Sequence, residues 1–468
     1  MESLSKQVKK IKTAPDWYKT SFPAQIKFIE DPARFKTGLC TRRAGKSYGA
    51  GIYLFKTAYE TPNITCLYIA KTRDSARNIM WKDILKQIDR DFNLGAKFQE
   101  ANLRVILPNG SEIMLVGVDS NQDDMEKLRG QRLKLAVLDE GSTYRINVFQ
   151  LVKKIIQPAL WDFQGTLAMI GTPTDFVKSY FALASSGEMR GWSNHFWTAD
   201  DNPHIREQYH EDYQEELAKD PNVESKAWFQ QEYMGKWVVS EENRIFLFGD
   251  GINNIPKYKG GLQYNLGLSV GTTTTGITIV GHTTKLREAL IVKNITLLTT
   301  DITRILSKLR RLEKEYGEFN YIVMDGVTPK LIDEIGSRFD ISTPDESEKD
   351  LEAIIRLFKT ELLQNNVKVF PECSDILEEW KSIVKDDKPS SRLEIHPACP
   401  SLLTRAALHA WFNCYNYTFE PEIESDDPND AYWEREAARI TNASRTGGIS
   451  EDSREVPRNP PSNWWYGS

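Results

Sequence analysis

Short apolar runs alternate with longer amphipathic stretches between about residue 35 and residue 239. Apolar runs of roughly four to eight residues between turn residues are typical of buried strands, and apolar residues three or four apart are typical of helices. Asp74 is the predicted N-cap of one helix, and Asn109-Gly110 predicts a tight hairpin. The alternation predicts an α/β fold with a mostly parallel sheet, which binds ligands at the carboxyl ends of its strands. The predicted strands are 64–70, 103–107, 113–118, 135–138 and 165–170, and the predicted helices are 49–58 and 74–89.

The pattern changes after about residue 240, where charged residues, glycine and asparagine cluster and indicate a linker or domain edge. Three closely spaced strands are predicted next, followed by helices that alternate with strands, an order found in RNase H-like folds. We predict a first domain at 1–240, a linker at 241–262, a second domain at 263–440 and a flexible tail at 441–468. The strands are 265–270, 276–282, 288–298, 321–324 and 367–370, and the helices are 302–316, 329–339 and 350–365.

Composition narrows the class of protein. A chain of 468 residues predicts two or three domains, and 40% hydrophobic with 27% charged residues is typical of a soluble globular protein. We expect no membrane span, because no apolar run approaches ~20 residues, and no signal peptide at residues 1–12. Five cysteines without CxxC spacing favour reduced thiols in a cytosolic compartment and no zinc site. The net charge of −6 argues against a surface coated in basic patches, but it permits a local basic strip around a duplex.

The strongest chemical signal is a basic loop before the predicted helix 49–58, with the sequence Cys40-Thr41-Arg42-Arg43-Ala44-Gly45-Lys46-Ser47. It follows the phosphate-binding pattern G-x-x-x-x-G-K-[ST], except that Cys40 stands where the first glycine is usual. Backbone N–H groups at the start of a helix attract phosphate. Lys46 would reach the outer phosphates, Ser47 would ligate Mg²⁺, and Gly45 and Arg43 would line the phosphate cradle.

A second signal lies about ninety residues further on, where the apolar run 135–138 ends in Asp139 and Glu140. A strand with this ending would present Asp139 to a metal ion and Glu140 to an attacking water. Together with the basic loop, this pair of carboxylates predicts a Mg²⁺-dependent ATPase.

With Lys46, Asp139-Glu140, Thr172 and the acidic residues near 325 and 430 in view, the chain resembles the large terminase subunit of tailed bacteriophages over about residues 15–440. Phosphate loops of that family often lack the first glycine and carry an arginine. The resemblance implies a DNA-translocating, RecA-like P-loop ATPase domain of the ASCE class, followed by an RNase H-like nuclease domain. Asn202-Pro203-His204 and Gln231-Glu232-Tyr233 echo short signatures of the family.

The resemblance also implies individual roles, and each has a simpler structural alternative. Gln25 in Phe22-Pro23-Ala24-Gln25 would read adenine, with Trp17 or Tyr18 stacking, or it is an ordinary helix-start residue. Arg129 in Leu128-Arg129-Gly130-Gln131 would be an arginine finger acting in trans, or it pairs with Asp123, Asp124 or Glu126. Arg42 or Arg43 would serve from within the loop instead. Thr172 in Gly171-Thr172-Pro173 would sense the γ-phosphate, or it is turn chemistry before the proline.

The nuclease motif has a gap. Two-metal cleavage needs converging carboxylates, and the family takes one aspartate from a G-[LIV]-D-x-G strand, which here is Gly267-Leu268-Ser269-Val270-Gly271. Asp325, at the end of an apolar run, and Asp430, helped by Asp427, are the remaining predicted ligands of Mg²⁺ or Mn²⁺. Capping or turn roles are the alternatives for these acids. A hydroxyl does not replace a bridging carboxylate, so we expect poor cleavage, whether Ser269 is an engineered replacement or natural divergence.

The resemblance further implies Mg-ATP as the energy source and double-stranded DNA, a portal protein and a small terminase subunit as partners. It implies a ring, of five subunits by family analogy, in the cytoplasm of the infected bacterial host and transiently on the procapsid, with no membrane. The main alternative is a DExx-type helicase or remodelling ATPase with a C-terminal nucleic-acid-binding module. A scaffold with a vestigial phosphate loop is the third possibility.

Overall fold

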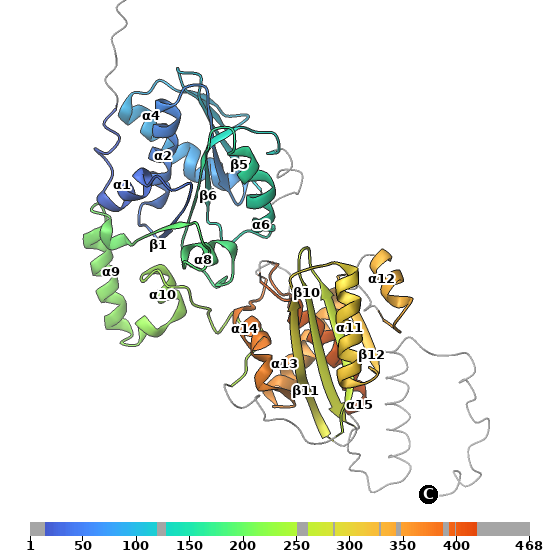
Figure 1. The fold of residues 1–468 in the computed structure, drawn as a ribbon. Helices are drawn as coiled ribbons and strands as arrows, with labels where there is room; N and C mark the ends of the chain where they lie inside the picture. The colour runs from blue at the N-terminus through green and yellow to red at the C-terminus, as the bar shows by residue number, and fades with distance from the viewer. Residues whose placement is uncertain are drawn as a thin grey trace, which may run out of the picture. The chain divides into compact units, whose positions relative to one another are not determined.

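The computed structural model of the protein describes residues 15–118, 128–249, 261–283, 286–326, 329–342, 348–386, 393–397 and 399–418. The chain forms two compact units (Figure 1). Unit 1 contains residues up to Gly249 together with Ser347–Leu363 and Ser374–Thr404. Unit 2 contains Asp250–Glu346, Gln364–Cys373 and the residues from Arg405 onward.

Unit 1 is built on an eight-stranded sheet with the strand order β3-β4-β5-β2-β6-β7-β1-β8. The six strands from β5 to β8 are parallel, and β3 and β4 form an antiparallel edge. All strands predicted for this half are present, including the hairpin around Asn109-Gly110. Their bounds are β1 (Phe35–Cys40), β2 (Thr65–Ala70), β3 (Lys97–Gln99), β4 (Arg104–Ile106), β5 (Glu112–Gly117), β6 (Leu133–Asp139), β7 (Thr166–Gly171) and β8 (Ser193–Trp197).

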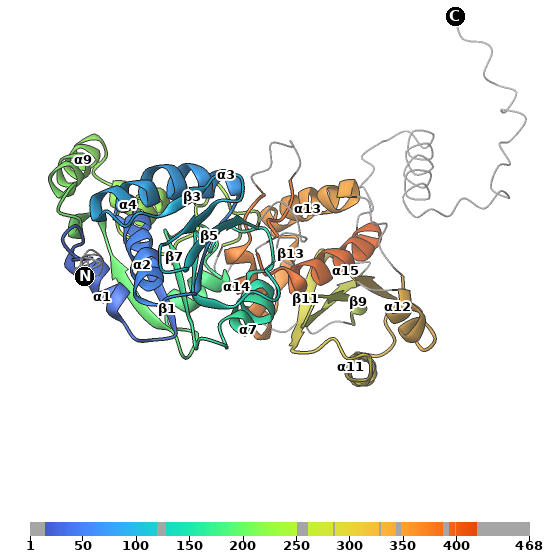
Figure 2. The same ribbon diagram turned by 90° about the horizontal axis from the view of Figure 1, so that it is seen from above.

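Helices cover both faces of this sheet, so that the apolar strands are buried on each side (Figure 2). One face carries α1 (Pro23–Glu30), α2 (Lys46–Glu60), α3 (Arg73–Ser75), η1 (Ala76–Leu85, π-helical) and α4 (Lys86–Phe92). The other carries α6 (Val148–Gln150), η2 (Leu151–Ile156), α7 (Gln157–Ala159) and α8 (Tyr180–Ser185). The remaining helices of unit 1 are η3 (Ala199–Asp201), α9 (Arg206–Lys219), η4 (Val223–Ser225), α10 (Ala227–Glu232), α13 (Glu348–Leu363) and α14 (Ser374–Ser382).

The predicted start of the second helix is wrong by two residues. Thr72, not Asp74, is the N-cap: its backbone is extended and its hydroxyl accepts a hydrogen bond from the Ser75 N–H at 3.0 Å. Asp74 lies in the first turn, where a carboxylate also interacts favourably with the positive end of the helix dipole. Two neighbouring polar residues can both satisfy the N-cap rule, and the backbone of Thr72 decides between them.

Unit 2 contains a five-stranded sheet with the order β12-β9-β10-β11-β13. β9 (Gln263–Val270), β10 (Thr275–Thr283) and β11 (Leu286–Leu297) form an antiparallel series, as predicted. β12 (Tyr321–Asp325) runs parallel to β9, and β13 (Val367–Val369) runs parallel to β11. Because β9 and β11 both oppose β10, their carboxyl ends lie at the same edge of the sheet, together with that of β12.

Helices lie on both faces of this second sheet, with α11 (Ile302–Tyr316) on one and α15 (Leu402–Thr418) on the other (Figures 1 and 2). Asp301 caps α11 by accepting a hydrogen bond from the Arg304 N–H. α15 approaches β9 so closely that a Cβ atom on Gly267 would lie 1.8 Å from the Ala406 carbonyl oxygen. The predicted helices near 302–316 and 329–339 correspond to α11 and α12 (Pro329–Gly336); η5 (Pro371–Cys373) follows β13.

The mixed α/β class predicted from the sequence is confirmed, whereas the domain boundaries at 240, 262 and 440 stay predictions. Asp427, Asp430 and the predicted tail 441–468 lie outside the described residues, as do Asp123, Asp124 and Glu126. In the part of the chain that the structure describes, no helix is long and apolar enough to cross a membrane.

Candidate active site

The basic loop connects β1 to α2, at the carboxyl edge of the parallel sheet of unit 1. Cys40 is the last residue of β1 and is fully buried, and its backbone is not in the left-handed region. The left-handed positions of the loop are Arg43 and Gly45, with φ of 61° and 75°. The missing first glycine therefore imposes no strain, because position 40 belongs to the strand.

Three contacts from the end of β8 and the chain after it hold this loop in place. The indole N–H of Trp197 donates to the Ala44 carbonyl at 2.8 Å, and the Asn202 amide donates to the Arg43 carbonyl at 3.1 Å. The Thr41 hydroxyl accepts a hydrogen bond from the Ala199 N–H at 2.7 Å. Sequence reasoning missed the role of Trp197, because a buried tryptophan at the end of a strand has the pattern of an ordinary core residue.

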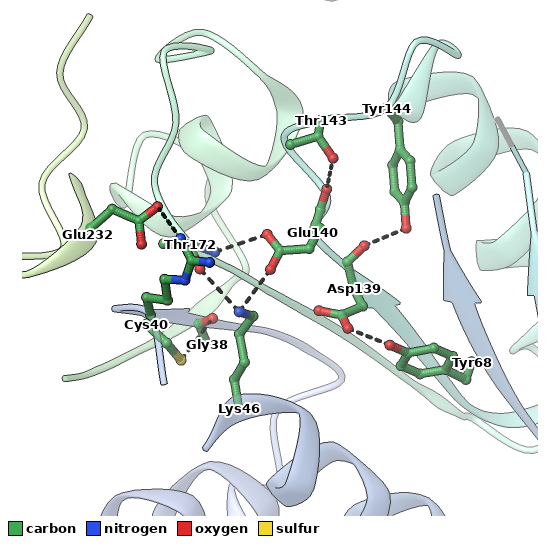
Figure 3. Close-up of polar contacts among 11 residues, drawn as sticks. Gly38, Cys40, Lys46, Tyr68, Asp139, Glu140, Thr143, Tyr144, Thr172 and Glu232 are labelled. Atoms are coloured by element: carbon green, nitrogen blue, oxygen red, sulfur yellow. Dashed lines mark hydrogen bonds and ion pairs between the residues drawn. The ribbon is translucent and has the colours of Figure 1, made fainter. Parts of the chain in front are cut away.

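Lys46 meets Glu140 and Thr172 in front of the loop (Figure 3). Its ammonium lies 2.8 Å from a Glu140 carboxylate oxygen and donates to the Thr172 hydroxyl at 3.1 Å. Burial alone would lower the pKa of Lys46, but the carboxylates of Glu140 and Asp139 outweigh it and raise that pKa. Lys46 is therefore charged, and its charge is balanced by the two predicted catalytic acids.

The backbone of Glu140 is in the left-handed region, with φ of 54°. Such conformations cost roughly 1–3 kcal/mol for residues other than glycine and concentrate at functional sites. Here the Glu140 N–H still donates to the Ile170 carbonyl at 2.9 Å, so the end of β6 stays paired with β7. The turn directs the carboxylate across to β7, where Glu140 also accepts a hydrogen bond from the Thr172 N–H.

Asp139 is buried beside Glu140 and is held by Tyr68 of β2, whose hydroxyl donates to one of its carboxylate oxygens (Figure 3). Burial and the neighbouring Glu140 raise the pKa of Asp139 to about 6, against the opposing effect of Lys46 and Tyr68. Its other oxygen, Oδ1, is buried and has no hydrogen-bond partner in the described structure. An orphaned buried carboxylate oxygen is costly unless a cation binds it.

These residues fit a nucleotide with Mg²⁺. Lys46, Ser47, Glu140 and Thr172 line a cavity of about 690 Å³ together with Arg42 and Arg43. The free oxygen of Asp139 and the Ser47 hydroxyl are the hard oxygen ligands that Mg²⁺ prefers, and Mg²⁺ commonly takes its other ligands from phosphate and water.

A second cavity of about 310 Å³ is lined by Gln25 and Gly45 and by the rings of Phe22, Tyr48 and His204. The Gln25 amide donates to the Gly45 carbonyl at 2.7 Å, and its oxygen accepts from the Phe22 N–H at 3.3 Å. Gln25 thus serves the start of α1 and contacts the phosphate loop at once, so its two predicted roles are compatible.

Trp17 is a poor stacking candidate, contrary to the expectation from the sequence. Its ring is buried, with Tyr59 and Phe92 packed against it, and the Tyr18 hydroxyl bonds to Glu30. Neither residue lines the cavity beside Gln25.

The three candidate arginines are placed differently. Arg42 is largely exposed and lies 3.7 Å from Glu232 of the Gln231-Glu232-Tyr233 signature, which lines the same cavity. Arg43 is exposed and lines that cavity too. Arg129 is exposed in the loop before β6 and is not among the residues that line it. This placement leaves a role for Arg129 only from another subunit.

In unit 2, Ser269 and Asp325 are directly opposite each other in the parallel pair β9–β12. The Ser269 hydroxyl, itself buried, donates to Asp325 Oδ2 at 3.3 Å. Two basic side chains of α15 face this pair, and sequence reasoning missed both. Arg405 lies 3.5 Å from the same oxygen of Asp325. Burial lowers the pKa of His409, against the opposing effect of the Asp325 carboxylate.

This set does not fit a two-metal centre. It holds one carboxylate, one hydroxyl and one guanidinium, and a nearby cation competes with a metal for the carboxylate. Within the described ranges, no group of three or more His, Cys, Asp or Glu residues could hold a metal ion. The other predicted ligands, Asp427 and Asp430, lie outside those ranges.

Comparison with known proteins gives the family. Residues 38–249 match the model of the N-terminal part of the terminase large subunit, T4-like virus type. Across 83% of this chain and 94% of that chain, the structure resembles the large terminase of bacteriophage HK97, at 13% identity and a TM-score of 0.51. The large terminase of a thermophilic bacteriophage covers 83% of this chain and 97% of its own, at 16% identity and a TM-score of 0.40. No curated protein matches the sequence.

The fold is thus that of a two-part α/β protein with a phosphate-loop site in its first half. Through residues 38–249 the chain belongs to the family of phage terminase large subunits.

Proposed function

We propose that this protein is the motor subunit of a viral DNA-packaging machine, in which ATP hydrolysis drives double-stranded DNA into a procapsid. The observation that carries the proposal is the convergence of Lys46, Asp139, Glu140 and Thr172 at one edge of the parallel sheet of unit 1. These residues lie within the segment that matches the terminase family, and they surround a cavity large enough for a nucleotide.

The Lys46–Glu140 ion pair suggests how binding starts the reaction. Phosphate groups entering the loop would draw Lys46 away from Glu140, because they carry more negative charge than one carboxylate. Glu140 would then be free to orient a water and accept its proton. Mg²⁺, held by Ser47 and Asp139, supplies positive charge that neutralises phosphate oxygens. Gln25 would contact the adenine from the adjoining cavity.

Completion of the site would depend on an arginine. Arg42 or Arg43 could stabilise the developing charge from within the loop, and Arg129 could do so from a neighbouring subunit. Such a residue is worth roughly 10³–10⁵ in rate. A contribution from Arg129 would make hydrolysis depend on assembly of the ring.

Thr172 would report the state of the nucleotide to the rest of unit 1. It contacts both Lys46 and Glu140, and Asp175 follows three residues later. Asp175 accepts hydrogen bonds from the Gln231 amide, the Ser240 N–H and the Asn243 amide. Movement of the Thr172 loop would therefore be felt directly at residues 240–243.

For unit 2 we propose an RNase H-like nuclease that cuts concatemeric DNA with Mg²⁺ or Mn²⁺ in the family, and that is impaired here by Ser269. The competing Arg405 guanidinium supports this view. Double-stranded DNA, a portal protein and a small terminase subunit would be the partners of a ring, of five subunits by family analogy. It would act in the cytoplasm of the infected bacterium. The helicase alternative needs a second parallel βαβ series, and the antiparallel series β9–β10–β11 argues against it.

The decisive experiment is ATP turnover by Lys46→Ala, with Lys56→Ala as a matched control in the same helix. Lys56 pairs with Glu30 and Glu60, away from the loop. We expect no hydrolysis by Lys46→Ala and normal hydrolysis by the control; unchanged hydrolysis by Lys46→Ala would remove the phosphate-loop assignment. Displacement of a triplex-forming strand from an intact duplex would indicate translocation, whereas separation of the duplex strands would favour a helicase.

A further inference from the structure

Unit 2 contains a groove beside α11 that none of the roles above uses. The basic groove, as we call it, is a cavity of about 410 Å³ between α11 and the chain that follows α12. Four cationic residues line it: Arg310, Arg311 and Lys314 on α11, and Arg338 after α12. Glu334 is the one acid in the lining.

These four cations are not neutralised by the protein around them. All four are exposed, and among the described residues none makes an ion pair, although Glu313 and Glu315 lie on the same helix. Elsewhere in the chain exposed basic residues on helices do have acidic partners, such as Arg356 with Glu352. A chain with a net charge of −6 thus leaves four cations together in one hollow. Their mutual repulsion favours binding of a polyanion.

The shape of the groove favours a sugar–phosphate backbone. Thr303, Ser307, Arg310 and Lys314 recur every three or four residues, so they form one row along α11. The row extends over roughly 16 Å of helix, and a duplex strand places a phosphate about every 3.4 Å along its axis. Guanidinium groups and hydroxyls are suitable donors to phosphate oxygens.

The same lining disfavours recognition of bases. Leu306 is its only apolar side chain, and it has no aromatic ring on which an unpaired base could stack. The groove also starts at the edge of the sheet where β9 and β12 end, because β11 delivers the chain to Ile302 at that edge. Duplex DNA lying along α11 would therefore lead towards the Ser269–Asp325 pair.

We propose that the basic groove binds the phosphate backbone of double-stranded DNA without regard to base sequence. The inference rests on the proposed function, in that it takes DNA as the substrate, and it adds a binding site on unit 2 that is separate from the nucleotide site.

The test is the salt dependence of duplex binding by the full chain. Each phosphate contact contributes about 0.9 to the slope of log K against log salt concentration. The variant Arg310→Gln/Arg311→Gln/Lys314→Gln should therefore lower the slope by about 2–3, equally for two duplexes of unrelated sequence. Arg338→Gln should lower it by about 1.

Two controls separate charge from folding. Lys308→Gln removes a cation of α11 that does not line the groove and should leave the slope unchanged. The charge-conserving variant Arg310→Lys/Arg311→Lys/Lys314→Arg should bind as the unchanged chain does. ATP hydrolysis by every variant reports that unit 1 is folded.

Two outcomes would overturn the inference in distinguishable ways. An unchanged slope in the triple glutamine variant, with normal DNA binding by the parent chain, would reject the groove and leave the proposed function intact. No duplex binding by the parent chain at any salt concentration would reject the proposed function and the groove together.

Discussion

The two units each hold a carboxylate next to a cation, yet the two arrangements differ in what they leave free. In unit 1, Lys46 lies 2.8 Å from Glu140, while the adjacent Asp139 keeps a buried oxygen without a partner. In unit 2, Arg405 lies 3.5 Å from Asp325, and the same oxygen accepts from Ser269. An acid–base contact therefore does not define an active site by itself. The uncompensated oxygen and the cavity beside it distinguish the first arrangement from the second.

The largest effect is expected from removing the second acid of unit 1. Glu140→Gln should reduce ATP turnover by roughly 10²–10⁴, the range of general acid–base catalysis. Nucleotide binding should persist, because Lys46 is then released from its ion pair. Steady-state hydrolysis and nucleotide titration measure the two quantities, and Glu211→Gln on α9 is a matched exposed control. Hydrolysis at the parental rate would show that Glu140 is no more than the partner of Lys46.

The reverse change in unit 2 should create activity. Ser269→Asp restores a carboxylate opposite Asp325, and we expect plasmid cleavage in Mn²⁺ to rise by about 100-fold. Ser269→Asn is the uncharged control. Adding Arg405→Gln should raise cleavage further, because it removes the competing cation.

Each other result has a definite meaning. Equal cutting by the parent chain and Ser269→Asp would show that position 269 holds no metal. No cutting by either would turn unit 2 into a DNA-binding module. A loss of cutting on adding Arg405→Gln would make Arg405 part of the machinery.

A smaller effect should come from Tyr68, which positions Asp139. Tyr68→Phe removes a hydrogen bond to a carboxylate, worth about 1.5 kcal/mol or a little more, so turnover should fall roughly tenfold at low Mg²⁺. Excess Mg²⁺ should restore most of it, which a general loss of stability would not allow. Tyr180→Phe is the control, since the Tyr180 hydroxyl is buried without a described partner. Equal Mg²⁺ dependence in the two variants would contradict the positioning role.

The smallest effect concerns a carboxylate that is structural. Burial alone would raise the pKa of Asp31, but hydrogen bonds from Ser193, the Ala33 N–H and His195 outweigh it and lower the pKa from 3.8 to about 2. Ionised Asp31 therefore stabilises the fold above pH 3.8, and this contribution is lost as the pH falls through about 2.

Asp31→Asn tests that contribution. It should cost about 2 kcal/mol at pH 7, a fall in Tm of roughly 4–8 °C, and the difference should shrink on acidification towards about pH 3. Thermal unfolding at both pH values measures it, with the exposed Asp83→Asn as control. A difference independent of pH would assign the effect to packing instead of charge.

The elements could be predicted from the sequence wherever the apolar pattern was strong. The expected bounds of α11, β9 and β12 agree with the structure to within two residues, because their apolar periodicity and turn signals coincide. The N-cap was displaced from Asp74 to Thr72, since neighbouring polar residues give the same signal.

The site was less accessible to such reasoning. Lys46, Asp139 and Glu140 stand in a motif, and the structure brings them together. Tyr68 and Arg405 reach their acids from a different strand and from a helix far along the chain, so no local pattern marks them. Contacts between distant segments arise from packing, which one sequence does not encode in any short window.

The close approach of α15 to β9 at Gly267 has a consequence for how this protein can change. Position 267 admits no side chain without moving the helix that carries Arg405 and His409, whereas position 269 accommodates residues of different charge on an unaltered scaffold. Geometry and chemistry are thus under separate control two residues apart. A lineage could silence or revive the second unit at Ser269 while the shape that would receive DNA stays the same.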